Sequence, residues 1–233
     1  MKIKGFSGVE KKVATLIAVS VFCLILSGCI ITFTFETKIN PDGSGRRIQD
    51  IALESSFARM LESAAKKSGK PSLKEELKKN LPKEGKLRIY TKRGKVHYEI
   101  NFDFKNIDEL NRINKKLSAV RDISTNVKLT KKDSIFLVLY DFKEKIPPLE
   151  ATELERLEML EACSVVYKLT MPGKIIKANT NEIEGETAMW DVNPFKGKEI
   201  RAKSRYIRWR AISFLLFLLV LISAGGILLR KRG

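Results

Sequence analysis

The chain has 233 residues, with 44 Lys and Arg against 27 Asp and Glu, and a formal net charge of +17. Hydrophobic residues make up 44% of it, which is enough for a packed core and excludes wholesale disorder. Three Cys and one His are too few for multi-His or multi-Cys metal sites, or for a disulfide scaffold. We therefore expect no metal and no cofactor.

The N-terminal residues have the pattern of a secretory signal peptide. Four lysines between positions 2 and 12 precede an apolar run over 13–26. Leu26-Ser27-Gly28-Cys29 follows and resembles a bacterial lipobox, in which the Cys receives a diacylglycerol and becomes the mature N-terminus. We expect residues 1–28 to be a lipoprotein signal peptide and Cys29 to be the lipidation site. The alternative is that the apolar run is not cleaved and stays as a second membrane helix.

Hairpins and helices alternate in the next part of the chain. Apolar and polar side chains alternate over 31–39, and a turn pattern at 41–45 leads into a second strand at 46–53. Helical spacing predicts a helix over 53–64, and Ser72 with Glu75 forms a capping-box pattern for another. A second hairpin is predicted over 87–104, turning at Arg93-Gly94, and Asn106 with Glu109 begins a helix over 107–117.

Strands dominate the remainder of this region. A third hairpin is predicted over 124–142, with 131–133 as its turn and 135–140 as a central strand, because that strand is apolar on both faces. Leu154, Leu157 and Leu160 predict a helix, and four short strands follow near 163–171, 174–178, 186–192 and 198–204. No linker divides the region, so we expect one extracytoplasmic domain over residues 29–204.

The C-terminal part has the pattern of a membrane anchor. Residues 211–229 contain no charged side chain, and as a helix they would be about 28 Å long, close to the bilayer core. Trp209 precedes this run, and Arg230, Lys231 and Arg232 follow it, which favours a cytoplasmic C-terminus. We expect residues 205–233 to be a juxtamembrane segment, a transmembrane helix over 211–229 and a basic tail. The protein would then lie in the plasma membrane, with its ectodomain on the extracytoplasmic face.

The predicted fold class is α+β. It combines antiparallel hairpins that alternate with amphipathic helices, a β-rich C-terminal part and one C-terminal transmembrane helix.

A resemblance to a known family adds to this interpretation. Tyr167-Lys168-Leu169-Thr170-Met171-Pro172-Gly173-Lys174-Ile175, then Asn179, then Thr187-Ala188-Met189-Trp190-Asp191-Val192 resemble the LppM-type domain of bacterial lipoproteins. The resemblance is clearest over 163–204. It implies an envelope role in which envelope lipids are recognised, and it brings no catalytic residues to this chain.

No side-chain pattern indicates catalysis. The sequence lacks the motifs of serine hydrolases, phosphate-binding loops, zinc proteases and dinucleotide-binding folds, and we expect no enzyme. His97 lies on the polar phase of its strand, so we expect it to face solvent. Cys163 opens an apolar strand and is expected to be a small buried residue.

The excess positive charge is concentrated between residues 66 and 95. This stretch has 12 basic and 3 acidic residues, a net charge of +9, whereas the rest of 29–204 has a net charge of −1. The alternative is a solvated surface with pairs such as Glu75–Lys79. The residues of the predicted anionic-ligand surface are Lys66, Lys67, Lys70, Lys74, Lys78, Lys79, Lys83, Arg88, Lys92, Arg93 and Lys95.

These observations together favour a membrane-anchored envelope lipoprotein with a non-catalytic binding or scaffolding ectodomain. The expected partners are the membrane, with its anionic lipids, or anionic wall polymers, and not nucleic acid. The apolar positions Phe57, Leu61 and Ala64 would assist the basic surface. Two alternatives remain, namely a module that docks another envelope protein by strand addition, and a carrier of an apolar lipid.

Overall fold

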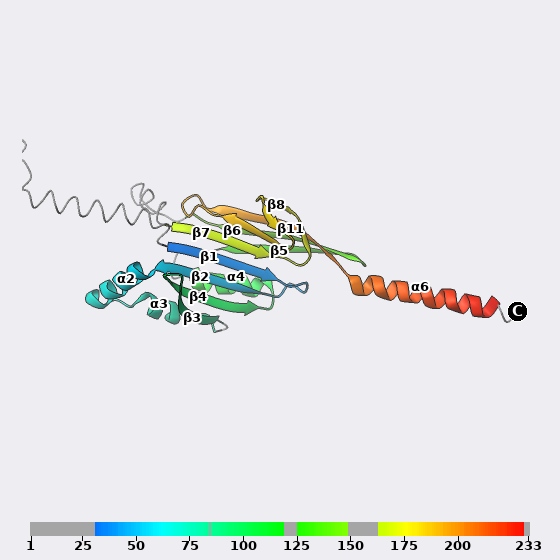
Figure 1. The fold of residues 1–233 in the computed structure, drawn as a ribbon, viewed down its shortest axis with the longest axis horizontal. Helices are drawn as coiled ribbons and strands as arrows, with labels where there is room; N and C mark the ends of the chain where they lie inside the picture. The colour runs from blue at the N-terminus through cyan, green and yellow to red at the C-terminus, as the bar shows by residue number, and fades with distance from the viewer. Residues whose placement is uncertain (1–30, 84, 119–124, 149–162, 231–233) are drawn as a thin grey trace, which may run out of the picture.

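Two β-sheets form the body of the protein. The computed structural model describes residues 31–83, 85–118, 125–148 and 163–230, with side chains described as far as Leu219 (Figure 1). The first sheet has the strand order β3-β4-β2-β1-β7-β10-β9, and the second has the order β5-β6-β11-β8. The strands of the first sheet are β1 (Ile31–Ile39), β2 (Gly45–Glu54), β3 (Gly85–Lys92), β4 (Lys95–Phe104), β7 (Cys163–Thr170), β9 (Glu182–Glu184) and β10 (Thr187–Asp191). Those of the second are β5 (Asn126–Asp133), β6 (Leu137–Ile146), β8 (Lys174–Ala178) and β11 (Lys198–Ile207).

Four helices accompany the sheets in the described residues. They are α2 (Ser55–Ser68), α3 (Leu73–Lys79), α4 (Ile107–Ser118) and α6 (Trp209–Arg230). In Figure 1, α2 and α3 lie at one end of the strands, and α6 extends from the other end. This arrangement gives the molecule two distinct ends along the strand direction.

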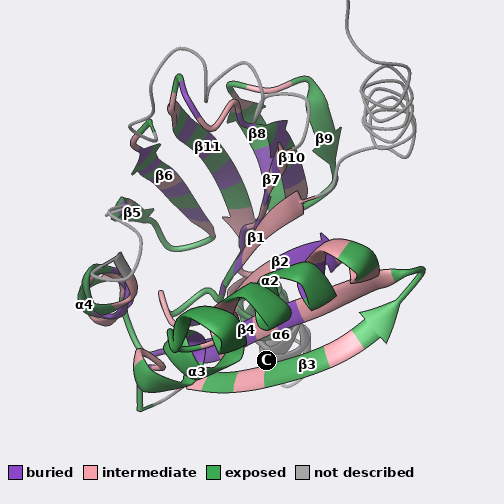
Figure 2. Ribbon diagram, turned by 90° about the vertical axis from the view of Figure 1, so that its left-hand side faces the viewer, coloured by how far each residue is buried: buried purple, intermediate pink, exposed green. Residues whose placement is uncertain are grey.

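The hydrophobic core lies between the sheets. The alternation of apolar residues along each strand places one set of side chains inward, and these are the buried positions in Figure 2. Phe102 of β4 faces inward from the first sheet, and Phe142 and Ile200 face inward from the second; all three are at most 1% exposed. Leu110 and Ile113 close one side of the core from α4.

The centre of the first sheet has a pairing that no hairpin predicts. β1 is antiparallel to β2 but parallel to β7, with Phe33 opposite Val165. The two paired strands are separated by more than 120 residues, so local sequence patterns cannot reveal this contact. The pairing joins the N-terminal hairpin to the C-terminal strands in one sheet.

Several predicted elements lie where the sequence indicated. The hairpins β1–β2 and β3–β4 occur, and the capping box of Ser72 and Glu75 is formed at the start of α3. The amide of Glu109 donates a hydrogen bond to Asn106 Oδ1 at 2.9 Å, as expected for the start of α4. β9 was not predicted, and the predicted helix at residues 154–160 lies outside the described residues.

The third hairpin was placed wrongly. Its turn is at residues 134–136 and not at 131–133, because β5 continues through Asp133 and β6 begins only at Leu137. Ile135 and Phe136 therefore lie in the turn and not in a strand. The strand that follows them is internal, as expected, since β6 pairs with both β5 and β11.

The predicted fold class is also wrong. The described chain is a β-rich sandwich with four helices, and not an α+β fold in which hairpins alternate regularly with amphipathic helices. Within the part of the chain that the structure describes, no helix is long and apolar enough to cross a membrane. This finding overturns the transmembrane helix predicted over 211–229, and with it the plasma-membrane location with a cytoplasmic C-terminus.

Candidate functional site

The basic residues predicted from the sequence share one region of the molecule. They lie on α2 and α3, on the segments that follow these helices, and on the hairpin β3–β4. All of these side chains are exposed except that of Lys95, which is half-buried and donates from Nζ to Thr32 Oγ1 at 3.4 Å. Because β3 is the edge strand of its sheet, its backbone edge also faces solvent. We call this region the basic end.

Acidic side chains neutralise little of this charge. Glu75 does not pair with Lys79, because its carboxylate accepts a hydrogen bond from the amide of Ser72 at 2.8 Å. That backbone hydrogen bond lowers the pKa of Glu75. Among the described residues, Arg88 has an acidic partner, Glu99, at 3.8 Å, whereas the lysines of α2 and α3 form no ion pair. The positive charge of the basic end is therefore available to a ligand.

The apolar face assigned to α2 is only partly exposed. Phe57 packs against the core, so it does not face outward as predicted. Leu61 and Ala64 are exposed, and Met60 is exposed beside them. The helix is attached through its first turn, where Ala58 is buried, and the rest of it projects from the sandwich.

The strand registers bring the basic end close to the start of β1. Ile31 lies opposite Leu53, Leu53 opposite Val96, and Val96 opposite Thr91. The turn between β3 and β4 and the first turn of α2 therefore lie at the end of the sheet where β1 begins. Cys29 itself lies outside the described residues. β1 begins two positions after it, at this end of the sheet.

A buried ion pair joins the two sheets at the centre of the molecule. Arg47 of β2 donates from Nη2 to Glu144 Oε1 at 2.8 Å and from Nη1 to Oε2 at 3.2 Å. Both side chains are at most 1% exposed. The hydroxyl of Tyr167 also donates to Glu144 Oε2 and lies 3.0 Å from Thr37 Oγ1. The Arg47 guanidinium lies over the rings of Phe35 and Tyr167, with centroids 5.8 and 5.7 Å away.

The buried charges shift the ionisation of their neighbours. Burial by itself lowers the pKa of Arg47, but the negative charge of Glu144 raises it, and the net pKa is above its usual range. Burial, followed by the charge of Glu144, raises the pKa of Tyr167 well above its usual range. Arg47 therefore stays charged and Tyr167 stays neutral at ordinary pH, so the cluster has the properties of a structural link between sheets.

Sequence reasoning missed this pair, although a signal was present. Arg47 occupies an inward position of β2, and Glu144 lies between Phe142 and Ile146 on the inward phase of β6. A charged residue at an inward strand position is rarely buried unless a partner neutralises it. Two inward-facing residues of opposite charge on different strands indicate a buried ion pair. The sequence alone does not show that these two strands face each other.

His97 is not the solvent-facing residue that was predicted. Its Nδ1 lies 2.7 Å from Asp50 Oδ2, and both side chains are only 17% exposed. Its ring stacks on Tyr90 with centroids 4.8 Å apart, and the hydroxyl of Tyr90 donates to Glu99 at 3.2 Å. Cross-strand pairing between β2, β4 and β3 brings these groups together. Cys163, which was expected to be buried, is half-buried at the start of β7.

The residues of the family motif help to join the two sheets. Trp190 is buried and donates from its indole to Asn179 Oδ1 at 3.0 Å, and the same oxygen accepts the amide of Arg201 at 2.9 Å. The Asn179 amide donates to the carbonyl of Glu199 at 2.6 Å, so one side chain connects β10 of the first sheet to β11 of the second. Gly173 has φ +70°, and a Cβ there would lie 2.3 Å from the carbonyl oxygen of Arg205.

The residues assigned to a membrane interface are only partly described. Trp209 opens α6 and is 67% exposed. The side chain of Arg230, together with Lys231 and Arg232, lies outside the described part of the chain. Within the described residues, no three His, Cys, Asp or Glu side chains are grouped so as to hold a metal ion.

Comparison with known proteins identifies the family. The LppM domain family matches residues 38–206, which is 169 of the 233 residues. An uncharacterised protein of Archaeoglobus fulgidus is 29% identical over 215 residues, covering 90% of this chain and 92% of that protein. The NMR structure of the folded domain of the Mycobacterium tuberculosis LppM protein has 14% identity and a TM-score of 0.46, covering 79% of this chain and 94% of that one. The chain therefore belongs to the LppM domain family and is a lipoprotein-type envelope protein.

Proposed function

We propose that this protein is attached to the envelope membrane by a lipid on Cys29, and that its basic end binds phosphate-bearing lipid headgroups without catalysing a reaction. The observation that supports this most directly is the common location of the two features. The first turn of α2 and the β3–β4 turn, which carries Lys92, Arg93 and Lys95, lie at the end of the sheet where β1 begins, two residues after Cys29. A lipid on Cys29 would hold this end close to the headgroups.

The lipid and the basic end would have different tasks. A diacylglycerol on Cys29 carries two acyl chains, which together are a stable membrane anchor. A basic residue near an anionic membrane contributes about 1 kcal/mol. The five exposed lysines on α2 and α3 would therefore contribute up to about 5 kcal/mol toward orienting the domain on an anionic membrane.

The two alternative functions differ in how much the structure supports them. The edge strand β3 could accept a strand from another envelope protein, since its outer backbone edge is not paired within the described sheet. A lipid carrier has less support. The pocket between the first sheet and the helices, lined by Phe33, Phe35, Leu77 and Ile100, has a volume of about 30 Å³, which is room for about one water molecule.

A titration of the full-length protein tests the proposed ligand. Short-chain phosphatidylglycerol, short-chain phosphatidylcholine and inorganic polyphosphate would be added to the protein in a neutral detergent. Backbone amide shifts of α2, α3 and β3 would report binding. We expect shifts with phosphatidylglycerol and not with phosphatidylcholine. A response to polyphosphate alone would indicate a wall polymer instead of a lipid.

Charge reversal gives the matched control. The test variant carries Lys74→Glu, Lys78→Glu, Lys79→Glu and Lys83→Glu, and should lose the binding. The control variant carries Lys128→Glu, Lys143→Glu, Lys145→Glu and Lys177→Glu, which are exposed positions on the second sheet with the same change in net charge. Equal binding by the two variants would refute a specific role for the basic end.

A mass measurement tests the anchor separately. The membrane-extracted protein should have the mass of residues 29–233 plus a diacylglycerol, and Cys29→Ala should not acquire the lipid. An unmodified full-length mass would refute lipidation at Cys29.

A further inference from the structure

The tip of the β5–β6 hairpin exposes large apolar side chains. Ile135 is 74% exposed and Phe136 is 38% exposed. The turn is closed by Ser134, whose amide donates to the carbonyl of Leu137 at 2.8 Å and whose Oγ accepts the amide of Leu137 at 3.2 Å. Tight hairpin turns usually contain Gly, Asn or Asp at these central positions. Neither turn chemistry nor core packing therefore accounts for Ile135 and Phe136.

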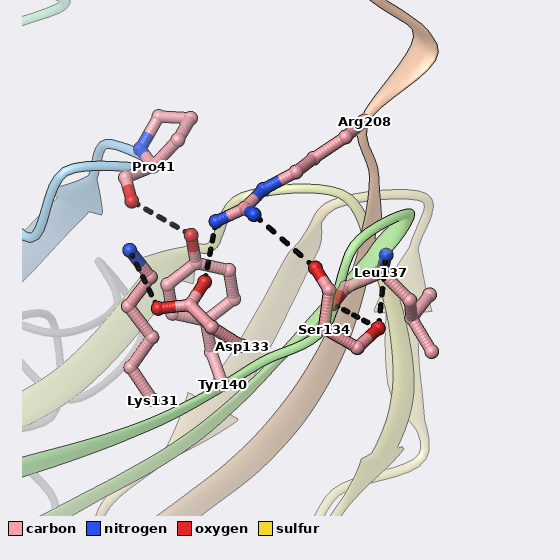
Figure 3. A network of polar contacts seen from close by, with 7 residues as sticks. All are labelled: Pro41, Lys131, Asp133, Ser134, Leu137, Tyr140 and Arg208. Carbon is pink, nitrogen blue, oxygen red and sulfur yellow. Dashed lines mark hydrogen bonds and ion pairs between the residues drawn. The ribbon is translucent and has the colours of Figure 1, made fainter. Parts of the chain in front are cut away.

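Arg208 fixes the start of α6 to this tip. Its amide donates to the carbonyl of Phe136 at 2.9 Å, and its side chain donates to the carbonyl of Ser134 at 3.2 Å and to Asp133 Oδ1 at 2.5 Å. Figure 3 shows the side-chain contacts of Arg208. It also shows a neighbouring hydrogen bond, in which the hydroxyl of Tyr140 donates to the carbonyl of Pro41 at 2.7 Å. The carbonyl of Arg208 also accepts the amides at the start of α6. The tip and the first turn of α6 thus form one rigid end.

Trp209 adds a third apolar side chain to this end. It follows Arg208 directly and is 67% exposed. The hydrogen bond from the Arg208 amide to the Phe136 carbonyl places the backbone of Trp209 one residue from the tip of the hairpin. We call these three residues the apolar tip.

Basic side chains surround the apolar tip. Residues 131–137 and 205–211 contain five basic residues, Lys131, Lys132, Arg205, Arg208 and Arg210, and one acidic residue, Asp133. Asp133 is already engaged, because it accepts from Arg208 and lies 3.4 Å from Lys131 Nζ. The two chain stretches that carry the three exposed apolar side chains therefore have a net charge of +4.

We infer that the apolar tip inserts into the headgroup region of an anionic lipid bilayer. Protruding Ile, Phe and Trp side chains bury apolar surface at the boundary between headgroups and acyl chains, where Trp is favoured. Lys and Arg around them reach the lipid phosphates. A surface that binds protein has its apolar core inside a broad contact area, whereas these side chains protrude from a narrow hairpin end. This site is separate from the basic end, because α6 and α2 lie at opposite ends of the strands (Figure 1).

Tryptophan fluorescence of the full chain can test this insertion. Trp190 is 1% exposed inside the sandwich, so it gives a constant background signal. Trp209→Phe removes the other Trp, and a reporter is then introduced either by Ile135→Trp at the tip or by Ile183→Trp on the edge strand β9. Both positions carry exposed isoleucines, so the control makes the same chemical change.

The vesicles contain phosphatidylcholine and phosphatidylglycerol, with lipids brominated either near the headgroup or near the end of the acyl chain. We expect the fluorescence of the Ile135→Trp reporter to be blue-shifted on binding and to be quenched more by the shallow bromines than by the deep ones. The fluorescence of the Ile183→Trp reporter should stay unquenched. Lys132→Gln and Arg210→Gln should each lower vesicle binding by the tip about fivefold. Quenching that is absent at Ile135→Trp, or equal at the two positions, would overturn the inference.

The same assay separates this inference from the proposed function. The variant reversed at Lys74, Lys78, Lys79 and Lys83 should lose short-chain lipid binding at the basic end while its Ile135→Trp reporter is still quenched. Loss of quenching in that variant would show that the basic end, and not the tip, brings this part of the chain to the bilayer.

Discussion

Removal of Glu144 should be among the most destabilising single changes in this chain. Glu144→Leu leaves the Arg47 guanidinium charged and almost completely buried, since both side chains are at most 1% exposed. It removes two guanidinium hydrogen bonds and the acceptor for Tyr167, whose hydroxyl would keep Thr37 as a partner. Breaking a buried ion pair from one side costs about 3–5 kcal/mol. Since domains are stable by about 5–15 kcal/mol, this is a large share of the total.

The double variant Arg47→Met with Glu144→Leu distinguishes a lost charge partner from lost packing. It replaces the pair with apolar side chains of similar size, and such replacements are often neutral or stabilising. We expect the double variant to be more stable than Glu144→Leu alone. The assay is urea unfolding followed by the fluorescence of Trp190, whose ring lies 5.9 Å from that of Tyr167. A loss below about 1 kcal/mol in Glu144→Leu, the level of an exposed pair, would refute the reasoning.

Three further changes test the links between the two sheets. Asn179→Ala leaves the buried indole of Trp190 without its acceptor, and urea unfolding should show a loss of about 1–3 kcal/mol or more; an unchanged midpoint would contradict this. Gly173→Ala places a Cβ 2.3 Å from the carbonyl oxygen of Arg205 at a positive φ, so thermal unfolding should show a lower Tm than in the matched variant Gly43→Ala, where no atom lies within 4 Å of the added Cβ. The pKa of Tyr167 is raised in the folded state by burial and by Glu144, so its contribution to stability is complete below about pH 10 and decreases as the pH rises above that value. Between pH 10 and 12 the free energy of unfolding should decrease more steeply in the native chain than in Tyr167→Phe, and parallel curves would exclude this linkage.

Local elements of the fold could be predicted because their signals are local. The alternation along β1 and β4, the Arg93-Gly94 turn and the capping box of Ser72 all depend on residues close together in the chain. The parallel contact of β1 with β7 could not be predicted in this way, because β7 follows more than 120 residues later. The same limit hid the carboxylate partner of His97, because Asp50 is 47 residues away on another strand.

The misplaced third turn has a different cause. Lys131, Lys132 and Asp133 have the polar composition of a turn, and Ile135 with Phe136 has that of a strand. In the structure the polar residues continue β5, and the apolar residues occupy the turn. Local propensity and structure disagree here, and such disagreements are expected at functional sites. This disagreement is what points to the apolar tip as a binding surface.

The family motif and the two proposed binding surfaces belong to different parts of the molecule. The motif residues Gly173, Asn179 and Trp190 hold the two sheets together, so a resemblance built on them predicts the fold and not the ligand. The basic end and the apolar tip lie outside that motif and toward opposite ends of the strands (Figure 1), and a nine-residue strand such as β1 is about 30 Å long. If both surfaces contact one bilayer, the strands must lie along the plane of that bilayer. In a molecule that stood on one end, the surface at the other end would be farther from the membrane than the Debye length of about 8 Å. Quenching of Ile135→Trp together with lipid binding by α2 and α3 would therefore establish a flat orientation, whereas one without the other would identify the end on which the domain stands.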